Sequence, residues 1–220
     1  MHSIITHLLD LFFPRRSLSG GEGEFVTAEE LEMLQSSPVI LREERLRSEG
    51  LEFLDRIVAA ADYDEVPLLH RAVHTLKYKR VHGVGETLGA ILADVAGRNC
   101  SSMDGATPVL CPVPLHWTRK FNRGFNQAEV LAEVVGRAWG WDVKNLLRRT
   151  RSTGSQVGRK RADRLVGVHD AFRMKFLNEV PRYVILVDDL STTGSTLDMC
   201  AKALKKAGVE RVEGLVLAMG

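Results

Sequence analysis

The sequence predicts an α/β protein with a mainly parallel β-sheet flanked by helices. Residues 183–187 form a short apolar run with β-branched members, which is typical of a central strand buried on both faces. Two carboxylates, Asp188 and Asp189, follow that strand directly, and helical spacing of apolar residues begins a few positions later. Because strands alternate with helices through most of the chain, we expect a doubly wound sheet.

The other elements follow from apolar spacing and from turn residues. Two helices are expected with apolar faces over residues 69–76 and 88–95, and Gly208 marks the end of the helix behind the acid pair. These two helices are expected to be followed by a strand at 108–113, a helix at about 125–139 and a short strand near Val143. A short strand near Ala171, the strand at 183–188 with its helix, and a last strand around 212–218 are expected to complete the chain.

The loop behind the acid pair has the composition of a phosphate site. Backbone N–H groups at a helix N-terminus attract phosphate, and in open α/β sheets ligands bind where strands end. Hydroxyl groups can add hydrogen-bond donors, and a glycine lets the backbone approach a ligand closely. The residues concerned are Ser191, Thr192, Thr193, Gly194, Ser195 and Thr196.

A phosphate site beside two carboxylates suits a ligand with a phosphate and vicinal hydroxyls, such as ribose 5-phosphate. The stretch 183–196 resembles the phosphoribosyl-pyrophosphate (PRPP) signature of type I phosphoribosyltransferases. This resemblance implies that Asp188 and Asp189 bind the ribose hydroxyls and that residues 192–196 hold the 5-phosphate. A Walker-type loop, a Rossmann loop or an ordinary strand-to-helix turn would be the alternative, but no such glycine motif follows a strand here.

A second segment narrows the resemblance. Residues 108–114 form an apolar strand closed by prolines, and a basic stretch, 115–127, leads into the next helix. Pro-Val-Pro-Leu-His and Arg-Gly-Phe-Asn-Gln in these two stretches are similar to hallmarks of the ComF family, a competence-associated branch of these transferases. The resemblance extends over residues 62–220, through Leu76-Lys77-Tyr78, Gln156 with Arg161 and Arg164, and Ala171-Phe172.

The resemblance implies a Mg²⁺-dependent transfer of a phosphoribosyl group from PRPP to a nitrogenous acceptor, with release of pyrophosphate and inversion at C1. The acceptor is not named by any motif. Besides the acid pair, the implied catalytic residues are Arg119 and Lys120, and His116 and Arg123 complete the basic loop that would contact pyrophosphate.

A basic segment, residues 148–169, is open to three interpretations. Its first part, 148–164, carries seven basic residues against Asp163. It can be a solvated surface loop, or a nucleic-acid site, although it has no aromatic residue for stacking. The resemblance favours a third interpretation, a lid that closes over PRPP and excludes water, through Gln156, Arg159, Lys160 and Arg161.

Residues 1–60 are expected to form a helical N-terminal extension without a role in function, and 61–220 the transferase-like domain. Leu51, Leu54 and Val58 have helical spacing, and Thr27 with Glu30 forms a capping box. ComF proteins usually carry a Cys-x-x-Cys zinc module near this N-terminus. Ser17 and Gly20 stand there instead, so we expect no zinc and a flexible connection over 17–24.

Composition is compatible with one enzyme-sized domain. At 220 residues with 45% hydrophobic residues the chain can bury a full core, and a net charge of +2 does not argue for nucleic acid. Its three cysteines have no metal spacing and are expected to be reduced. No membrane span or signal peptide is expected, and a cytoplasmic location is therefore expected. The resemblance to phosphoribosyltransferases implies a role in nucleotide metabolism. The apolar residues of the first 13 predict a helix packed on the domain or a partner, or one that contacts a membrane surface.

Two other functions stay open. The chain can be a PRPP sensor without chemistry in competence, or an accessory protein that binds single-stranded DNA within the DNA-uptake machinery. A homodimer is compatible with each of these functions.

Overall fold

The computed structural model describes most of the chain. The described residues are 17–21, 25–34, 37–78, 82–100, 103, 105–115, 125–149, 171–175 and 179–220. The elements, in chain order, are α2 (Ala28–Leu34), β1 (Val39–Arg42), α3 (Glu43–Ser48), β2 (Arg56–Asp62), α4 (Pro67–Tyr78), α5 (His82–Asn99), β3 (Val109–Pro112), α7 (Gln127–Trp139), β4 (Leu147–Arg149), β5 (Phe172–Met174), β6 (Tyr183–Ser191), α8 (Ser195–Lys206) and β7 (Arg211–Met219).

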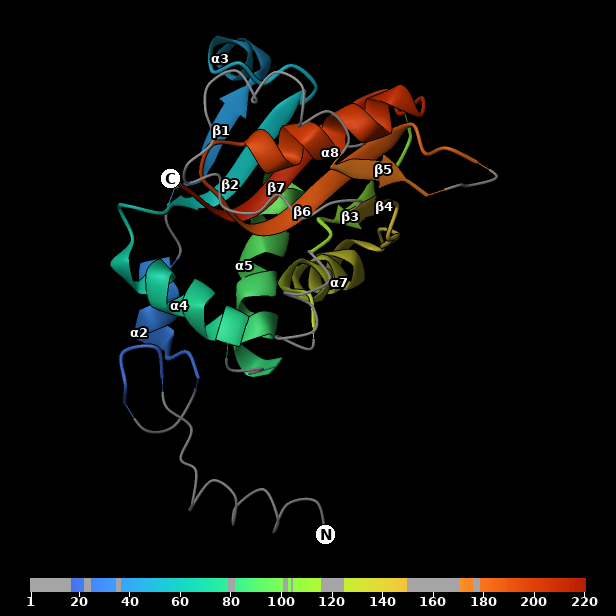
Figure 1. Cartoon of the computed structure of the whole chain (residues 1–220). Helices are drawn as coiled ribbons and strands as arrows, with labels where there is room; N and C mark the ends of the chain where they lie inside the picture. The colour runs from blue at the N-terminus through green and yellow to red at the C-terminus, as the bar shows by residue number, and fades with distance from the viewer. Residues whose placement is uncertain are drawn as a thin grey trace, which may run out of the picture.

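Five strands form the main sheet, in the order β1-β2-β7-β6-β3. β2, β7, β6 and β3 run parallel, and β1 pairs with β2 in the antiparallel direction at one edge (Figure 1). The four parallel strands therefore end on the same side of the sheet, which we call the carboxyl edge. This arrangement confirms the expected fold class, a doubly wound, mainly parallel sheet.

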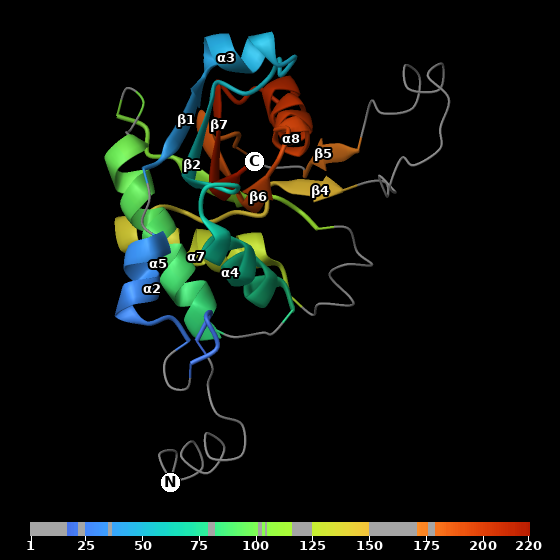
Figure 2. The ribbon, with the colours of Figure 1, turned by 90° about the vertical axis from the view of Figure 1, so that its left-hand side faces the viewer.

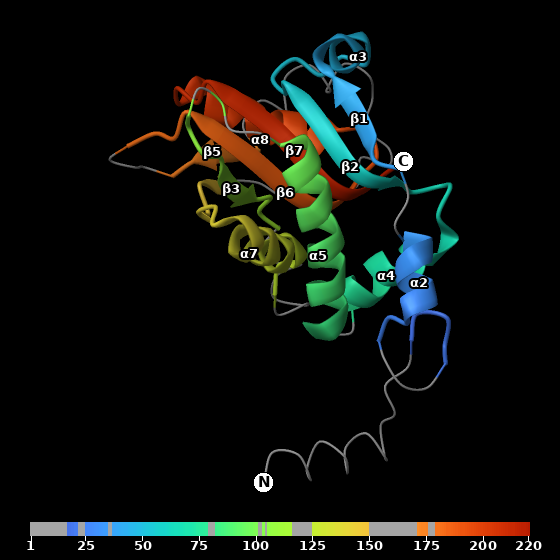
Figure 3. The same ribbon diagram turned by 180° about the vertical axis from the view of Figure 1, so that it is seen from behind.

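Helices cover both faces of this sheet. α8 lies over the face that is turned to the viewer in Figure 1, and α5 and α7 lie over the opposite face in Figure 3. Within β6, Ile185 and Val187 pack into one hydrophobic cluster and Val184 and Leu186 into the other, all with no exposed surface. Burial on both sides explains why this strand is continuously apolar. None of the described helices is long and apolar enough to cross a membrane.

A second, two-stranded sheet flanks the basic segment. β4 and β5 pair in the antiparallel direction, with Leu147 opposite Met174. β5 confirms the short strand expected near Ala171, whereas β4 was not expected, because its residues belong to a basic run. Residues 150–170, between the two strands, lie outside the described part of the chain.

The N-terminal part contributes strands to the main sheet. The helix expected through Leu51, Leu54 and Val58 is wrong, since β2 begins at Arg56 and 51–55 is an irregular connection. Leu54 packs into the cluster under α8, and Val58 packs into the cluster on the opposite face. Their spacing reflects burial on two sides of the sheet and not on one face of a helix.

The domain boundary at residue 60 stays a prediction, although β2 runs across it.

Residues 17–21 form an ordered turn that Glu30 fastens to α2. The Glu30 carboxylate accepts the backbone N–H of Ser19 at 2.6 Å and that of Thr27 at 2.9 Å. The Thr27 hydroxyl accepts the N–H of Glu30 at 3.2 Å, which completes the capping box. Leu18 of this turn is buried in the core. The flexible connection expected over 17–24 is therefore wrong for 17–21, while 22–24 lie outside the described residues.

Glu30 should make this turn sensitive to acid. Burial by itself would raise the pKa of Glu30, but hydrogen bonds from Ser19 and Thr27 outweigh it and lower the pKa to about 2. A lowered pKa stabilises the fold above the ordinary pKa of about 4.5, and this contribution is lost as the pH falls through 2.

Glu30→Gln should therefore lower the free energy of unfolding at pH 7 by about 1–3 kcal/mol, and the loss should shrink as the pH falls toward 2. Urea denaturation between pH 2 and 7 measures both effects. Glu29→Gln, which removes an exposed charge from the same helical turn, serves as the control. Equal effects of the two substitutions at pH 7 would show that the turn does not depend on Glu30.

A buried acid near the amino ends of the strands holds three of them in register. Glu213 of β7 has no exposed surface and accepts hydrogen bonds from Arg56 of β2 at 2.7 Å, Tyr183 of β6 at 2.9 Å and Arg211 at 2.7 Å. Burial raises the pKa of Tyr183, and the charge of Glu213 raises it further. A slip by one residue would move Glu213 to the other face and leave the arginines unpaired. By fixing the register of β2, β6 and β7 near their amino ends, the network also fixes where these strands end at the carboxyl edge.

Candidate functional site

The acid pair lies near the carboxyl edge, in the last four residues of β6, which continues to Ser191 and does not end before Asp188 as expected. Asp188 is half-buried and Asp189 is 7% exposed. The backbone N–H of Asp189 donates to Asp188 Oδ1 at 2.9 Å, which fixes the rotation of that carboxylate. β6 lies between β7 and β3, so the two acids stand inside the edge of the sheet and not at its margin. Their burial is greater than expected for carboxylates at a strand end.

The hydroxyl loop connects β6 to the N-terminus of α8. Thr192, Thr193, Ser195 and Thr196 are exposed, whereas Ser191 and Gly194 are buried. The Thr193 and Ser195 hydroxyls lie 2.9 Å apart, and α8 begins after Gly194 without a side-chain cap. The Thr193 hydroxyl accepts the N–H of Ser195 at 3.4 Å. A helix N-terminus with exposed hydroxyls can bind an anion. Six predicted residues and the acid pair are thus brought together within one strand-loop-helix unit.

Gly194 is required by the packing of the fold as well as by any ligand. Its φ is +70°, in the left-handed region that favours glycine. A Cβ atom built on Gly194 would lie 2.5 Å from Leu51 Cδ1 and 3.4 Å from Ile57 Cδ1. The close approach inferred from the sequence is therefore made, in part, to the protein's own residues 51–57.

Asp198 also ties the N-terminal segment to this loop. Its carboxylate, in the first turn of α8, accepts the N–H of Phe53 at 2.7 Å and of Leu54 at 3.1 Å. Sequence reasoning missed this contact, because an acid in a first helical turn usually has only a local role. Leu51 and Ile57 therefore pack on Gly194, and the backbone of Phe53 and Leu54 is bound by Asp198, so this segment supports the loop structurally. The expectation that residues 1–60 have no role in function stays a prediction.

The remaining predicted site residues lie outside the described part of the chain: His116, Arg119, Lys120, Arg123, Gln156, Arg159, Lys160 and Arg161. The structure does place the elements that lead to them. β3 ends beside the acid pair, with Pro112 opposite Val187 of β6. β4 and β5 bring both ends of the segment 150–170 together. The roles of these eight residues stay predictions.

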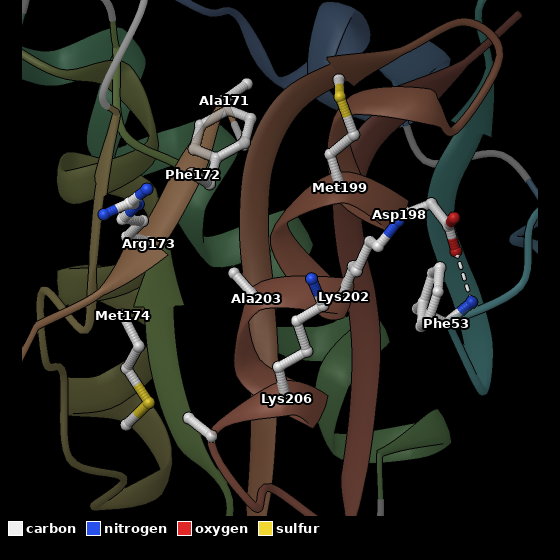
Figure 4. A pocket seen from close by; sticks show the side chains of 11 residues that line it. Phe53, Ala171, Phe172, Arg173, Met174, Asp198, Met199, Lys202, Ala203 and Lys206 are labelled. Atoms are coloured by element: carbon white, nitrogen blue, oxygen red, sulfur yellow. Dashed lines mark hydrogen bonds between the residues drawn. The ribbon is translucent and has the colours of Figure 1, made fainter. Parts of the chain in front are cut away.

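A groove of about 400 Å³ runs along the outer side of α8 (Figure 4). Its apolar wall includes Phe53, Phe172 and Met199, and Lys202 and Lys206 lie along its rim. Phe172 is buried, and the ammonium of Lys202 lies 5.1 Å from the centre of the Phe53 ring. The Phe172 ring is therefore closed to a nucleobase, and one face of the Phe53 ring is occupied by Lys202.

The three cysteines, Cys100, Cys111 and Cys200, are buried free thiols. Burial raises the pKa of Cys100 to about 12 and that of Cys111 to about 11, and it raises the pKa of Cys200 as well. Because the thiolate is the form that reacts and binds metal, these side chains are poor nucleophiles and poor ligands. Among the described residues, no group of three or more His, Cys, Asp or Glu could hold a metal ion.

Comparison with known proteins gives related sequences, although no family model matches the chain. The chain is 39% identical to Competence protein F of Haemophilus influenzae over 110 residues, which is 47% of each protein. It is 32% identical to the DNA utilization protein YhgH of Escherichia coli K12 over 162 residues, covering 72% of this chain and 69% of that protein. Competence protein ComFC of Streptococcus pneumoniae is 36% identical over 101 residues, or 46% of this chain and 43% of that one.

The chain thus spans about half the length of two of these relatives and about two thirds of the third. Among solved structures it is similar to the allosteric regulatory enzyme of purine biosynthesis, with a TM-score of 0.43 and 20% identity over 66% of this chain and 30% of that chain. The sequence relatives have competence or DNA utilization in their names, and the similarity to the Escherichia coli protein extends over 72% of this chain. The chain belongs to the ComF family.

Proposed function

We propose that this protein binds PRPP at the carboxyl edge and transfers its phosphoribosyl group to a nitrogenous acceptor. The observation that carries the proposal is the unit formed by the acid pair and the N-terminus of α8 with its exposed hydroxyls. It presents two carboxylates and an anion-binding helix end within nine residues, 188–196. A sugar phosphate with vicinal hydroxyls needs both features in one site.

In this proposal Asp188 and Asp189 accept hydrogen bonds from the ribose hydroxyls, and residues 192–196 hold the 5-phosphate. The C1–O bond to pyrophosphate breaks and the electron pair leaves with pyrophosphate. The acceptor nitrogen forms the new bond to C1 from the opposite face and then loses its proton to solvent. Arg119 and Lys120 are proposed to stabilise the leaving pyrophosphate, with His116 and Arg123 beside them.

Mg²⁺ fits this site as a partner of the ligand. The acid pair offers hard oxygen atoms, and phosphate oxygens and water would supply the remaining ligands that Mg²⁺ prefers. When bound, Mg²⁺ would supply charge neutralisation at the pyrophosphate. The protein's own part is to orient the ribose and the 5-phosphate and to exclude water from C1.

Calorimetric titration with PRPP, with and without Mg²⁺, tests the binding step. Screening nitrogenous acceptors for pyrophosphate release then tests the transfer. Binding with release supports the transferase, and binding without release of pyrophosphate favours the second candidate, a PRPP sensor in competence. No binding of PRPP in either condition would overturn the site assignment and favour the third candidate, which binds single-stranded DNA.

The single-strand candidate draws on the names of the relatives, which refer to competence and DNA utilization. Its weak point is stacking, because Phe172 in the groove on α8 is buried and Lys202 lies over one face of Phe53. Such binding would therefore depend on the basic segment 148–169.

A cytoplasmic location, a homodimer and a partner in DNA uptake are further parts of the proposal.

Replacing Arg159, Lys160 and Arg161 together by glutamine separates a lid from a nucleic-acid site. If the segment closes over PRPP, the triple variant should lose affinity for PRPP or turnover, and PRPP with Mg²⁺ should slow proteolysis of the segment in the parent protein. If it binds DNA, the variant should weaken single-strand binding and flatten its salt dependence. We expect the first result. Proteolysis that responds to an oligonucleotide and not to PRPP would contradict the lid.

A further inference from the structure

A stacked aromatic pair lies at the carboxyl edge, two strands away from the acid pair. Tyr63 follows β2, and His70 stands on α4, which lies beyond the carboxyl ends of β2 and β7 in Figures 1 and 2. The two ring centres are 3.9 Å apart, with an angle of 12° between the planes. Tyr63 is half-buried and His70 is exposed, so the outer face of the imidazole is open to a ligand.

The backbone fixes the position of this pair relative to the phosphate loop. The N–H of Tyr63 donates to Met219 O at 2.7 Å, and the N–H of Gly220 donates to Ser191 O at 3.1 Å. Met219 is in register with both Asp62 and Ser191. Because parallel strands are about 4.8 Å apart, the pair starts about 10 Å from Ser191 along the edge. A ribose with a planar base attached spans a distance of this order.

Hydrogen-bond acceptors occur on the pair and in the turn that follows it. His70 Nε2 lies 2.7 Å from Tyr63 O, and since a carbonyl oxygen can only accept, Nε2 carries the hydrogen. In the neutral ring Nδ1 then has the lone pair. The carboxylates of Asp64 and Glu65 are exposed in the turn after Tyr63, which Asp62 Oδ1 shapes by accepting the N–H of Asp64 at 2.9 Å.

We infer that Tyr63, Asp64, Glu65 and His70, which we call the aromatic edge, bind the acceptor of the transfer. This inference rests on the proposed function. β3, whose loop is proposed to hold pyrophosphate, lies on one side of β6, and β7 and β2 lie on the other. Inversion at C1 requires the acceptor to approach from the side opposite pyrophosphate. The aromatic edge stands on that opposite side.

The chemistry of the aromatic edge selects a class of acceptor. A flat ring favours a planar heterocycle, and Nδ1 with two carboxylates favours a ligand that donates hydrogen bonds. An amino-bearing base such as adenine fits both requirements. An anionic base such as orotate would meet the like charge of Asp64 and Glu65 and should be disfavoured.

Three ligands that share the ribose 5-phosphate unit test the inference in calorimetry. Adenosine 5′-monophosphate should bind the parent about 10-fold or more tightly than ribose 5-phosphate, because only the former carries a stacking base. Orotidine 5′-monophosphate should gain no such advantage. The ratio of affinities isolates the contribution of the base from that of the phosphate loop.

Two substitutions should abolish that ratio. Tyr63→Leu keeps an apolar side chain against Gly220 but removes the ring, and His70→Ala removes the open face. In both variants adenosine 5′-monophosphate should bind no more tightly than ribose 5-phosphate, whose own affinity should stay unchanged. Tyr63→Phe keeps the ring and is the matched control, with the ratio of the parent. Unchanged affinity for ribose 5-phosphate also shows that the variants are folded.

The outcomes separate this inference from the proposed function. If the parent does not bind ribose 5-phosphate, the proposed site and this inference both fail. If ribose 5-phosphate binds but the base adds no affinity, or if Tyr63→Leu and His70→Ala keep the parent ratio, the phosphoribosyl site stands and the aromatic edge is overturned. A preference for orotidine 5′-monophosphate would overturn the acceptor class.

Discussion

Replacing Asp188 and Asp189 together by asparagine should weaken PRPP binding by about 3 kcal/mol or more, which is a loss of at least about 100-fold. Each carboxylate is proposed to accept a charge-assisted hydrogen bond from a ribose hydroxyl, and an asparagine makes only a neutral one. Isothermal titration with PRPP and Mg²⁺ measures the loss. Affinity for inorganic phosphate should change little, because the loop 192–196 is unaltered.

Two controls make this result interpretable. Asp189 is 7% exposed, so asparagine is chosen to keep its shape, and thermal unfolding should confirm that the variant is folded. Glu133→Gln removes an exposed carboxylate from α7 and should leave PRPP affinity as it is in the parent. A folded double variant with parental affinity for PRPP would show that the acid pair does not bind the ribose.

Replacing Gly194 by valine should lower the free energy of unfolding by about 3 kcal/mol or more. Two costs add at this position. A β-branched residue is strained at a φ of +70°, and its Cβ would lie 2.5 Å from Leu51 Cδ1. Urea denaturation measures the loss. If this variant also loses phosphate binding, two causes would contribute. The valine would displace residues 51–57, and it would block the approach of the phosphate to the backbone.

Gly140→Val is the matched control for the backbone strain. Gly140 has a φ of +67°, but nothing lies within 4 Å of a Cβ atom built on it. It should therefore report the cost of the left-handed backbone alone. Leu51→Ala in the Gly194→Val background should restore part of the lost stability by making room. Equal destabilisation by Gly194→Val and Gly140→Val would exclude the packing role of Leu51.

The sequence predicted the central part of the fold well, for a physical reason. β6 and β7 are buried on both faces, so they appear as apolar runs, and α7 and α8 have one apolar face each. These patterns are local and can be read from a few neighbouring residues. The acid pair and the hydroxyl loop were recognised for the same reason, because they form one continuous stretch.

What the sequence did not predict depends on contacts between distant residues. Asp198 binds the backbone of Phe53, 145 positions earlier in the chain. Leu54 and Val58 imitate a helical face only because each packs on a different side of the sheet. Residues 17–21 were expected to be flexible, but the Glu30 carboxylate accepts the backbone N–H of Ser19. The capping box predicts only the bond between Glu30 and Thr27. In each case the partner, and not the local pattern, decides the structure.

The place of β7 in the sheet has a consequence for biosynthesis. β7, the last of the described strands, lies between β2 and β6, and its partners in β2 precede it by 157 residues. Until residues 211–219 have left the ribosome, the sheet can exist only as two separate pairs, β1 with β2 and β3 with β6. A nascent chain therefore exposes apolar strand edges until β7 has been made, and the strands on both sides of the candidate site are joined only then.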